Sequence, residues 1–325
     1  MFNLRPKMFE ESAKSHASPN LAVQLLIFLI VFFIIYVLEA IIPSIVSIPL
    51  MMEELVNQGY LEGTKKLTLD ESMKIASELS GLPKIMIPTL LSTVFGTLIS
   101  ILYCRCFEMR PLSSMGMRKR RLIPHYLQGL AVGIAMMTAI TLLTVVTGVN
   151  SISLCAEINY KLIALYFAGF LVQGMSEEFV FRGYLMNTVG GHHSAALAIG
   201  ISAAAFGIAH AVNPGFGVVP MINLVLFGVF ASLYMICFDD IWGVCAIHSV
   251  WNFTQGNIYG ISVSGSGDAE SVFRVASKSS ADILTGGEFG IEGSIFTTLV
   301  LAVGIVIVLV KIKKNSAVSQ SGGEE

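Results

Sequence analysis

Long apolar stretches recur along this chain, each about as long as a helix that crosses a bilayer. A membrane-spanning helix needs roughly 20 mostly apolar residues, and stretches of this kind follow one another from residue 21 to residue 310. In hydrocarbon, only helices and closed barrels satisfy every backbone polar group. The chain is 54% hydrophobic and 13% charged, which is too apolar for a soluble domain. We therefore expect an all-α, polytopic transmembrane helical bundle.

About eight spans account for these stretches. They are expected at residues 21–52, 84–107, 126–148, 162–186, 194–212, 218–238, 241–261 and 294–310. Together they form one integral-membrane domain over residues 20–312, with the lipid bilayer as a partner. Residues 1–19 and 313–325 are expected to be cytoplasmic tails.

Basic residues predict the orientation of the bundle. Arg118, Lys119, Arg120 and Arg121 lie in the loop before the third span, and three lysines follow the last span. The positive-inside rule makes both segments cytoplasmic, and an even number of spans then places both termini on that side of the plasma membrane. The net charge of −2 gives no reason to expect nucleic acid as a partner.

The polar segment between the first two spans contains a capping-box pattern. Thr68 is followed three residues later by Glu71, and apolar residues then recur at helical spacing. This pattern marks a helix N-terminus. It predicts a short amphipathic helix over residues 68–79 that lies on the membrane surface.

Three ionisable residues lie together in the fourth span, where each costs roughly 2.5–3.5 kcal/mol at the bilayer centre. Glu178 and Arg182 are four residues apart, so they share one helix face and can neutralise each other. Glu177 points about 100° away and has no such partner in its own helix. The pattern predicts one structural and one free carboxylate. A lone acid in the first span, Glu39, is expected to be satisfied by a neighbouring helix.

Two later spans carry polar pairs that could meet Glu177. Phe206 and His210 are one turn apart in the fifth span, and His248 and Asn252 are one turn apart in the seventh. Peptide hydrolysis needs a base for water and donors for the developing oxyanion. Glu177 with His210 has the chemistry to hold and activate water, while His248 and Asn252 can donate to the oxyanion.

The pattern Glu177-Glu178-x-x-x-Arg182, Phe206-x-x-x-His210 and His248-x-x-x-Asn252 resembles the three motifs of the CPBP family (CAAX protease and bacteriocin-processing, or Abi) of intramembrane proteases. The motif core covers residues 161–260. Eukaryotic members, similar to the type II CAAX prenyl endopeptidase, trim prenylated proteins, whereas bacterial members are linked to bacteriocin maturation or self-immunity. Residues 110–118 and 286–294 also look like bacterial members, so we expect a bacterial plasma membrane.

The resemblance implies a catalytic cavity lined by four residues, with three others in support. The lining residues are Glu177, His210, His248 and Asn252, and the supporting residues are Glu178, Arg182 and Phe206. A Zn²⁺ ion held by His210, His248 and Glu177 is one version of the site, and the family is often called a metalloprotease. Asparagine is a poor zinc ligand, however, and the motif lacks the His-Glu-x-x-His spacing of soluble metalloproteases. Chemistry alone favours the metal-free version.

The expected function is therefore an intramembrane endopeptidase, of glutamate or metallo type, that cleaves a membrane-associated, prenylated or leader-peptide substrate. A non-catalytic membrane immunity or scaffold protein could keep the same residues for binding. A proton- or ion-coupled transporter is a third hypothesis. It is disfavoured because the motif spans lack the internal prolines that broken transporter helices use.

Overall fold

The computed structural model describes residues 5–60, 68, 71, 72, 75, 79, 81–267 and 269–321, with side chains described up to residue 315. The predicted helix over residues 68–79 falls largely outside the described residues. Its capping box is nevertheless formed. The Glu71 backbone N–H donates to Thr68 Oγ1 at 3.3 Å, and the Thr68 N–H donates to Glu71 Oε2 at 2.9 Å.

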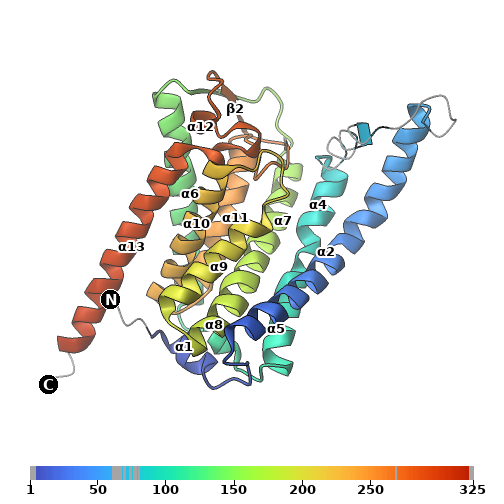
Figure 1. The fold of residues 1–325 in the computed structure, drawn as a ribbon. Helices are drawn as coiled ribbons and strands as arrows, with labels where there is room; N and C mark the ends of the chain where they lie inside the picture. Colours follow the sequence, from blue (N-terminus) through green and yellow to red (C-terminus); the bar gives the residue numbers. More distant parts are fainter. Residues whose placement is uncertain are drawn as a thin grey trace.

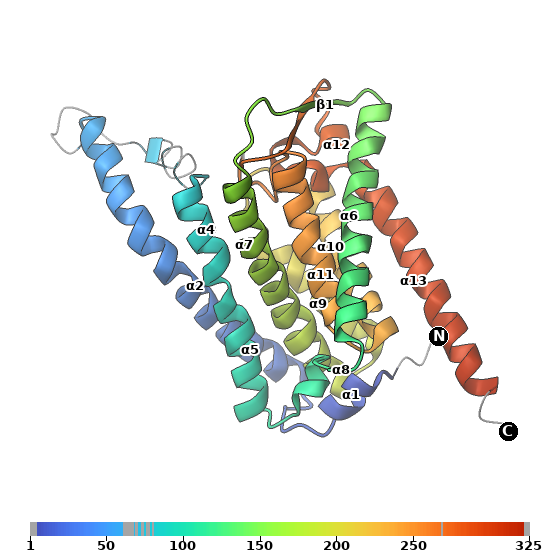
Figure 2. The same ribbon diagram turned by 180° about the vertical axis from the view of Figure 1, so that it is seen from behind.

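The described residues form a helical bundle with a small two-stranded cap at one end (Figures 1 and 2). The helices are α1 (Lys7–Ser12), α2 (Leu21–Asn57), α4 (Pro83–Ser92), α5 (Val94–Cys106), α6 (Leu122–Val146), α7 (Tyr160–Glu178), α8 (Asn187–His192), α9 (Ala195–Ala209), α10 (Val218–Phe238), α11 (Trp242–Phe253), α12 (Asp282–Thr285) and α13 (Ile295–Ser321). Helix α11 is the core element, because residues 243–252 are all buried. Helices α2 and α4 lean away from the rest of the bundle towards the capped end (Figure 1).

Each of the eight predicted spans is helical in the structure, so the all-α class is confirmed. Within the described residues, five helical stretches are long and apolar enough to cross a membrane: Leu21–Asn57, Pro83–Cys106, Leu122–Val146, Val218–Phe238 and Ile295–Asn315. Helix α9 is apolar but has only 15 residues, and α11 has 12. The structure therefore identifies five candidate spans among the described residues and leaves the count of eight a prediction, since the motif helices are shorter or more polar.

Helix α2 shows what a lipid-facing surface looks like in this chain. Phe33 and Ile45 are 67% and 69% exposed. Such a helix would be costly in water, whereas acyl chains surround apolar side chains at no penalty. Pro43 and Pro49 lie inside α2, as membrane helices tolerate.

Glycines let the neighbouring helices approach α11 closely on two sides. A Cβ atom added to Gly174 of α7 would lie 2.6 Å from Ser249 Oγ, and one added to Gly133 of α6 would lie 2.6 Å from a Val250 methyl group. Real Cβ atoms do not come this close to other atoms. Because both glycines lack a side chain, α11 is held tightly between α6 and α7.

Residues 262–293, which separate the last two predicted spans, contain regular structure that was not predicted. Strand β2 (Phe273–Ser277) pairs antiparallel with β1 (Asn150–Leu154), in a register that places Ile152 opposite Val275. Helix α12 and two short 3₁₀ turns, Gly287–Phe289 and Ile291–Gly293, follow. Sequence reasoning missed the strands because each is only five residues long and its partner is more than a hundred residues away.

The N-terminal segment, expected to be a tail, contains helix α1, which lies close to α8 at the end of the bundle opposite the strands (Figure 2). Its Met8 and Phe9 side chains are buried. At the other terminus α13 continues to Ser321, well past the predicted end of the last span.

Candidate active site

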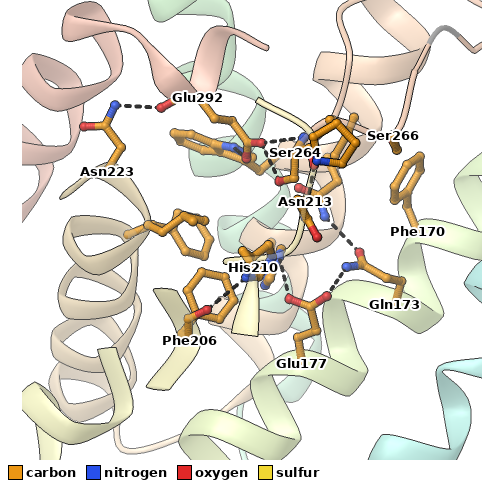
Figure 3. Close-up of a pocket in the computed structure, with 18 of the residues that line it drawn as sticks. Phe170, Gln173, Glu177, Phe206, His210, Asn213, Asn223, Ser264, Ser266 and Glu292 are labelled. Atoms are coloured by element: carbon orange, nitrogen blue, oxygen red, sulfur yellow. Dashed lines mark hydrogen bonds and ion pairs between the residues drawn. The ribbon is translucent and has the colours of Figure 1, made fainter. Parts of the chain in front are cut away.

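A cavity of about 790 Å³ opens between the motif helices and the outer helices α2, α4 and α13. Its polar side is shown in Figure 3. The lining residues that the motifs supplied are Glu177, Phe206, His210, His248 and Asn252. Tyr36, Met86 and Leu90 of the outer helices also line it, as does Phe170 of α7. The predicted lining residues, which come from three helices, therefore share one cavity.

Glu178 is the structural carboxylate of the adjacent pair. Its Oε1 atom accepts a hydrogen bond from Arg182 Nη1 at 3.0 Å and lies 2.7 Å from His248 Nδ1. The side chains of Glu178 and Arg182 are fully buried. The predicted i,i+4 pair is thus present, and it has a third member from α11 that sequence reasoning did not assign.

Glu177 faces the cavity and is 24% exposed. Its Oε1 accepts a hydrogen bond of 2.5 Å from Gln173 Nε2, one turn earlier on α7. Its Oε2 lies 3.7 Å from His248 Nε2 and has no hydrogen-bond partner among the described residues. One oxygen is therefore held by a hydrogen bond, while the second oxygen is buried beside His248 and has not used its hydrogen-bonding capacity. His248 lies between the two carboxylates, with one ring nitrogen towards each.

Asn252 is linked to Glu177 through Gln173. Asn252 Nδ2 donates to Gln173 Oε1 at 2.9 Å, and Gln173 then donates to Glu177. An asparagine amide has two N–H groups, so Asn252 keeps one donor after making this bond. This short chain of side chains fixes α7 and α11 relative to each other at the cavity wall (Figure 3).

His210 lies at the C-terminal end of α9, where the helix stops. Its Nδ1 is 2.9 Å from the carbonyl oxygen of Phe206. Because a carbonyl only accepts hydrogen bonds, Nδ1 carries the proton and Nε2 of the neutral ring is an acceptor. Figure 3 shows the His210 ring on the same side of the cavity as the Glu177 carboxylate.

Phe206 packs against two side chains of the site, Arg182 and His210. Its buried ring lies under the Arg182 guanidinium, 4.6 Å from ring centroid to Cζ, and its centroid is 4.8 Å from that of His210. A cation over an aromatic face is attracted by the ring quadrupole. Phe206 therefore helps to hold a buried charge and packs against a cavity-facing histidine.

The helix that carries the two glutamates changes its winding immediately after them. Residues Phe179–Met186 form a π-helix that is buried throughout, and Thr254–Ile258 form a second π-helix just after Asn252. π-helical turns are rare and are frequent at functional sites. The Phe181 carbonyl within the first π-helix accepts a hydrogen bond from Ser202 of α9 at 2.9 Å.

Two residues of the cavity wall were missed by sequence reasoning. Gln173 lies one turn before Glu177, so its spacing would have indicated a shared face. Glu292 is buried and accepts hydrogen bonds from Trp251 Nε1 at 2.9 Å, from Ser264 Oγ at 2.7 Å and from the Ser264 backbone N–H at 3.0 Å. Glu292 thus ties α11 to the loop above the cavity. No local pattern signals this role, because its partners are distant in sequence.

The lone acid of α2 lies near the same region. A Cβ atom added to Gly96 of α5 would be 3.0 Å from Glu39 Oε1, so the carboxylate rests against the α5 backbone. Glu39 is also close enough to Glu177 for their charges to interact. The expectation that a neighbouring helix accommodates Glu39 agrees with this contact.

The structure does not gather the donor set of the zinc site considered above. Nδ1 of His248 is bound to Glu178 and Nδ1 of His210 to the Phe206 carbonyl, which leaves Nε2 of each ring free, as metal-bound histidines also require. Among the residues that the structure describes, however, no group of three His, Cys, Asp or Glu side chains is placed to hold a metal ion. A catalytic zinc site needs three such ligands, so the described geometry does not assemble one.

Part of the chain is similar to a known protein family. A family model described as type II CAAX prenyl endopeptidase Rce1-like matches residues 159–254. This range contains both glutamates, both histidines, Asn252 and their supporting residues.

Residues 159–254 are similar to the Rce1-like family.

The Rce1-like family is made up of intramembrane proteases. This match and the five apolar helices support an integral membrane protein with protease activity. No curated protein and no solved structure matches the chain. The matched range begins at α7 and ends just after α11, so it coincides with the inner wall of the cavity. Helices α2, α4 and α13 and residue Glu292 complete the cavity from outside the matched range.

Proposed function

We propose that this chain is an intramembrane endopeptidase in which Glu177 is the general base that activates a water molecule. The observation that carries the proposal is the unequal placement of the adjacent carboxylates. Glu178 is fully buried and bound to Arg182 and His248, whereas Glu177 lines the cavity and its side chain is 24% exposed. Each carboxylate keeps one oxygen without a hydrogen bond among the described residues. A base must lie within reach of its water, and only Glu177 of this pair borders the cavity.

In the proposed reaction, the water donates one hydrogen bond to Glu177 Oε2 and the other to His210 Nε2. Glu177 takes a proton as the water oxygen bonds to the scissile carbonyl carbon. The negative charge that develops on the carbonyl oxygen is stabilised by N–H groups of His248 and Asn252, and such donors are each worth about 3 kcal/mol in other proteases. Protonated Glu177 then gives its proton to the leaving nitrogen as the C–N bond breaks.

His248 is suited to the oxyanion role by its place between two acids. Its Nδ1–H is held by Glu178 at 2.7 Å, which fixes the ring orientation. When the ring is protonated, Nε2–H points into the cavity near Glu177. The charges of Glu177, Glu178, Arg182 and His248 then sum to zero, which is the arrangement that a low-dielectric interior tolerates best.

The cavity wall supports a membrane-associated polypeptide as the substrate. Its inner side carries the polar motif residues, and its outer side includes Tyr36, Met86 and Leu90, with Phe170 of α7 facing the same cavity. An apolar group next to the scissile bond, such as a prenyl chain or the hydrophobic part of a leader peptide, would lie against these apolar residues. The family match, described as a type II CAAX prenyl endopeptidase, agrees with that substrate class.

The proposal is tested by comparing protein N-termini in membranes of cells that express the wild type or Glu177→Gln at equal levels. Peptide ends that appear only with the wild type are the expected result, and they identify substrates. If no ends differ in the native host while both proteins are folded and abundant, the chain is a non-catalytic membrane protein and the proposal is wrong.

Metal removal gives a second test with a purified protein and a substrate found in the survey. Because the described donors do not fit a three-ligand zinc site, we expect cleavage to persist after treatment with 1,10-phenanthroline and dialysis. Loss of cleavage that zinc restores would show that the metal-free mechanism is wrong, although the protease activity itself would stand.

A further inference from the structure

A second cavity lies at the end of the bundle opposite the β1–β2 cap, away from the candidate active site. It has a volume of about 650 Å³ and lies between the start of α6, the end of α10 and the segment around α1. Its lining is dominated by the cations Lys7, Arg118, Lys119, Arg120 and Arg121, with His125 beside them and Asp239 and Asp240 as the acids.

Both acids of this cavity are already paired within the protein. Asp239 Oδ2 lies 3.0 Å from Arg118 Nη2. Asp240 is paired with His125 and also accepts a hydrogen bond from the Trp242 backbone N–H at 3.1 Å. The acids are therefore engaged by Arg118 and His125, and neither forms an ion pair with the other basic residues of the lining.

Four cations of this cavity have no ion-pair partner among the described residues. They are Lys7, Lys119, Arg120 and Arg121, and all four are exposed. A fifth cation is close by, because Lys311 of α13 lies 4.0 Å above the ring of Phe238, which also lines the cavity. The result is a concentrated positive field at one rim of the bundle.

The start of α6 strengthens this field. Arg121 is the N-cap residue of α6, and no side chain caps the helix there. Free backbone N–H groups and the positive end of the helix dipole favour an anion at such a position. The uncapped helix end and the unpaired cations therefore face the same cavity.

An apolar strip continues from the cavity along α6. Ile123 and Leu127 follow the basic run one turn apart, and they are 68% and 59% exposed. On a membrane helix these side chains face acyl chains. A ligand with an anionic head and an apolar tail would meet cations in the cavity and apolar side chains along α6.

We propose that this second cavity binds the phosphodiester headgroup of an anionic phospholipid, with an acyl chain lying along α6. Basic pockets at the cytoplasmic side of helical bundles suit such headgroups. Inorganic phosphate would match the charges but would gain nothing from Ile123 and Leu127.

The loop that contains Arg118 is also hydrogen-bonded to the start of α11. Trp242 Nε1 donates to the Arg118 carbonyl oxygen at 2.7 Å, and Asp240 caps the first turn of α11. A bound headgroup would therefore order the segment from which the helix with His248 and Asn252 begins. Lipid binding should raise the thermal stability of the whole bundle.

The test uses purified full-length protein in neutral detergent, titrated with phosphatidylglycerol, phosphatidylcholine or inorganic phosphate. Affinity and the unfolding midpoint are measured for each. We expect phosphatidylglycerol to bind most tightly and to raise the midpoint, and 0.5 M salt to weaken its binding. The variant Lys119→Gln/Arg120→Gln/Arg121→Gln should bind about 100-fold more weakly, at about fivefold per charge.

Two further variants keep the result interpretable. The control Lys84→Gln/Lys161→Gln/Lys278→Gln removes three exposed charges at the capped end and should bind phosphatidylglycerol like the wild type. Arg120→Lys/Arg121→Lys keeps the charge and should keep most of the affinity. The proposal is overturned if the basic-run variant binds like the wild type, if the control loses as much affinity, or if inorganic phosphate raises the midpoint equally.

Discussion

Two clusters of buried polar side chains in this protein each contain a Glu–Arg ion pair. They differ in how many of their polar atoms have hydrogen-bond or ion-pair partners. In the first, which we call the Arg110 cluster, Arg110 Nε lies 2.7 Å from Glu108 Oε2, and Thr188 Oγ1 donates to Glu108 at 3.0 Å. The Arg110 guanidinium also donates to Ser12 Oγ and to the carbonyl oxygens of Gly183 and Tyr184. Each charged group is enclosed by partners.

The active-site cluster is left open. Glu177 Oε2 has no hydrogen-bond partner among the described residues, and neither do Nε and Nη2 of the buried Arg182. Buried polar groups are almost always paired, and an exception calls for a functional reason. The Arg110 cluster, in which the charged groups have partners, therefore joins α1, α5 and α8. The active-site cluster lies beside a cavity and keeps polar atoms that can bind water or a substrate.

The largest effect is expected for Glu178→Gln, because it removes the buried carboxylate that is ion-paired with Arg182. Arg182 would stay buried without a counter-charge, and such losses cost about 3–5 kcal/mol. His248 would lose the acceptor of its Nδ1–H, so cleavage should fall as well. Thermal unfolding in detergent and a cleavage assay measure the two effects.

Glu178→Gln/Arg182→Met is the matching double variant. It removes both charges, so most of the stability should return while cleavage stays low. If the double variant recovers cleavage, Glu178 does not orient His248.

Arg110→Ala should cost a similar free energy of unfolding, about 3–5 kcal/mol, because Glu108 is left buried and unpaired. The folded fraction should cleave at the wild-type rate, since this cluster does not line the catalytic cavity. Lys14→Ala, at an exposed position two residues after Ser12, should change the free energy of unfolding by no more than about 0.5 kcal/mol. A specific loss of kcat in folded Arg110→Ala would mean that the two clusters are coupled.

Asn252→Ala tests the open cluster with a smaller structural change. It removes an oxyanion donor and frees Gln173, so kcat should fall roughly 10²–10³-fold. Its cost in stability should be about 1 kcal/mol. Asn20→Ala, which removes the N-cap of α2, should cost about as much stability and leave kcat unchanged. Equal kcat in the two variants would remove Asn252 from the mechanism.

Gly174→Ala is the mildest way to disturb the contact between α7 and α11. The added methyl group would meet Ser249, and overpacking of this kind costs about 1–3 kcal/mol. Gly200→Ala in α9 is the matched control, because nothing lies within 4 Å of its added Cβ. The control should be neutral or slightly stabilising, since alanine favours helix more than glycine does. Equal unfolding midpoints would mean that α7 and α11 can separate freely.

Local sequence patterns predicted most of the helices. Apolar run length located the helical segments, since a helix in lipid satisfies its own backbone. The spacing of Glu178 and Arg182 predicted their ion pair, because residues four apart lie on the same face of a helix. The β1–β2 pairing and the two π-helices were not predicted, because they depend on partners from distant parts of the chain.

The sequence predicted which residues line the site, but it predicted only some of the contacts between them. The motifs named residues that share one cavity, but nothing local showed that His248 binds Glu178 through Nδ1. The link from Asn252 through Gln173 to Glu177 joins two helices, and Glu292 reaches the cavity from a segment forty residues later. Contacts of this kind are set by packing, which the spacing of residues within one helix does not encode.

The most direct test of the account is the single-turnover cleavage rate of purified Glu177→Gln, measured together with its unfolding midpoint. Removing a general base should lower the rate by about 10²–10⁴-fold. Because Glu177 is partly exposed and its Oε2 is unpaired, the midpoint should stay at the wild-type value. A rate within tenfold of the wild type, in a protein with an unchanged midpoint, would contradict the assignment of Glu177 as the base.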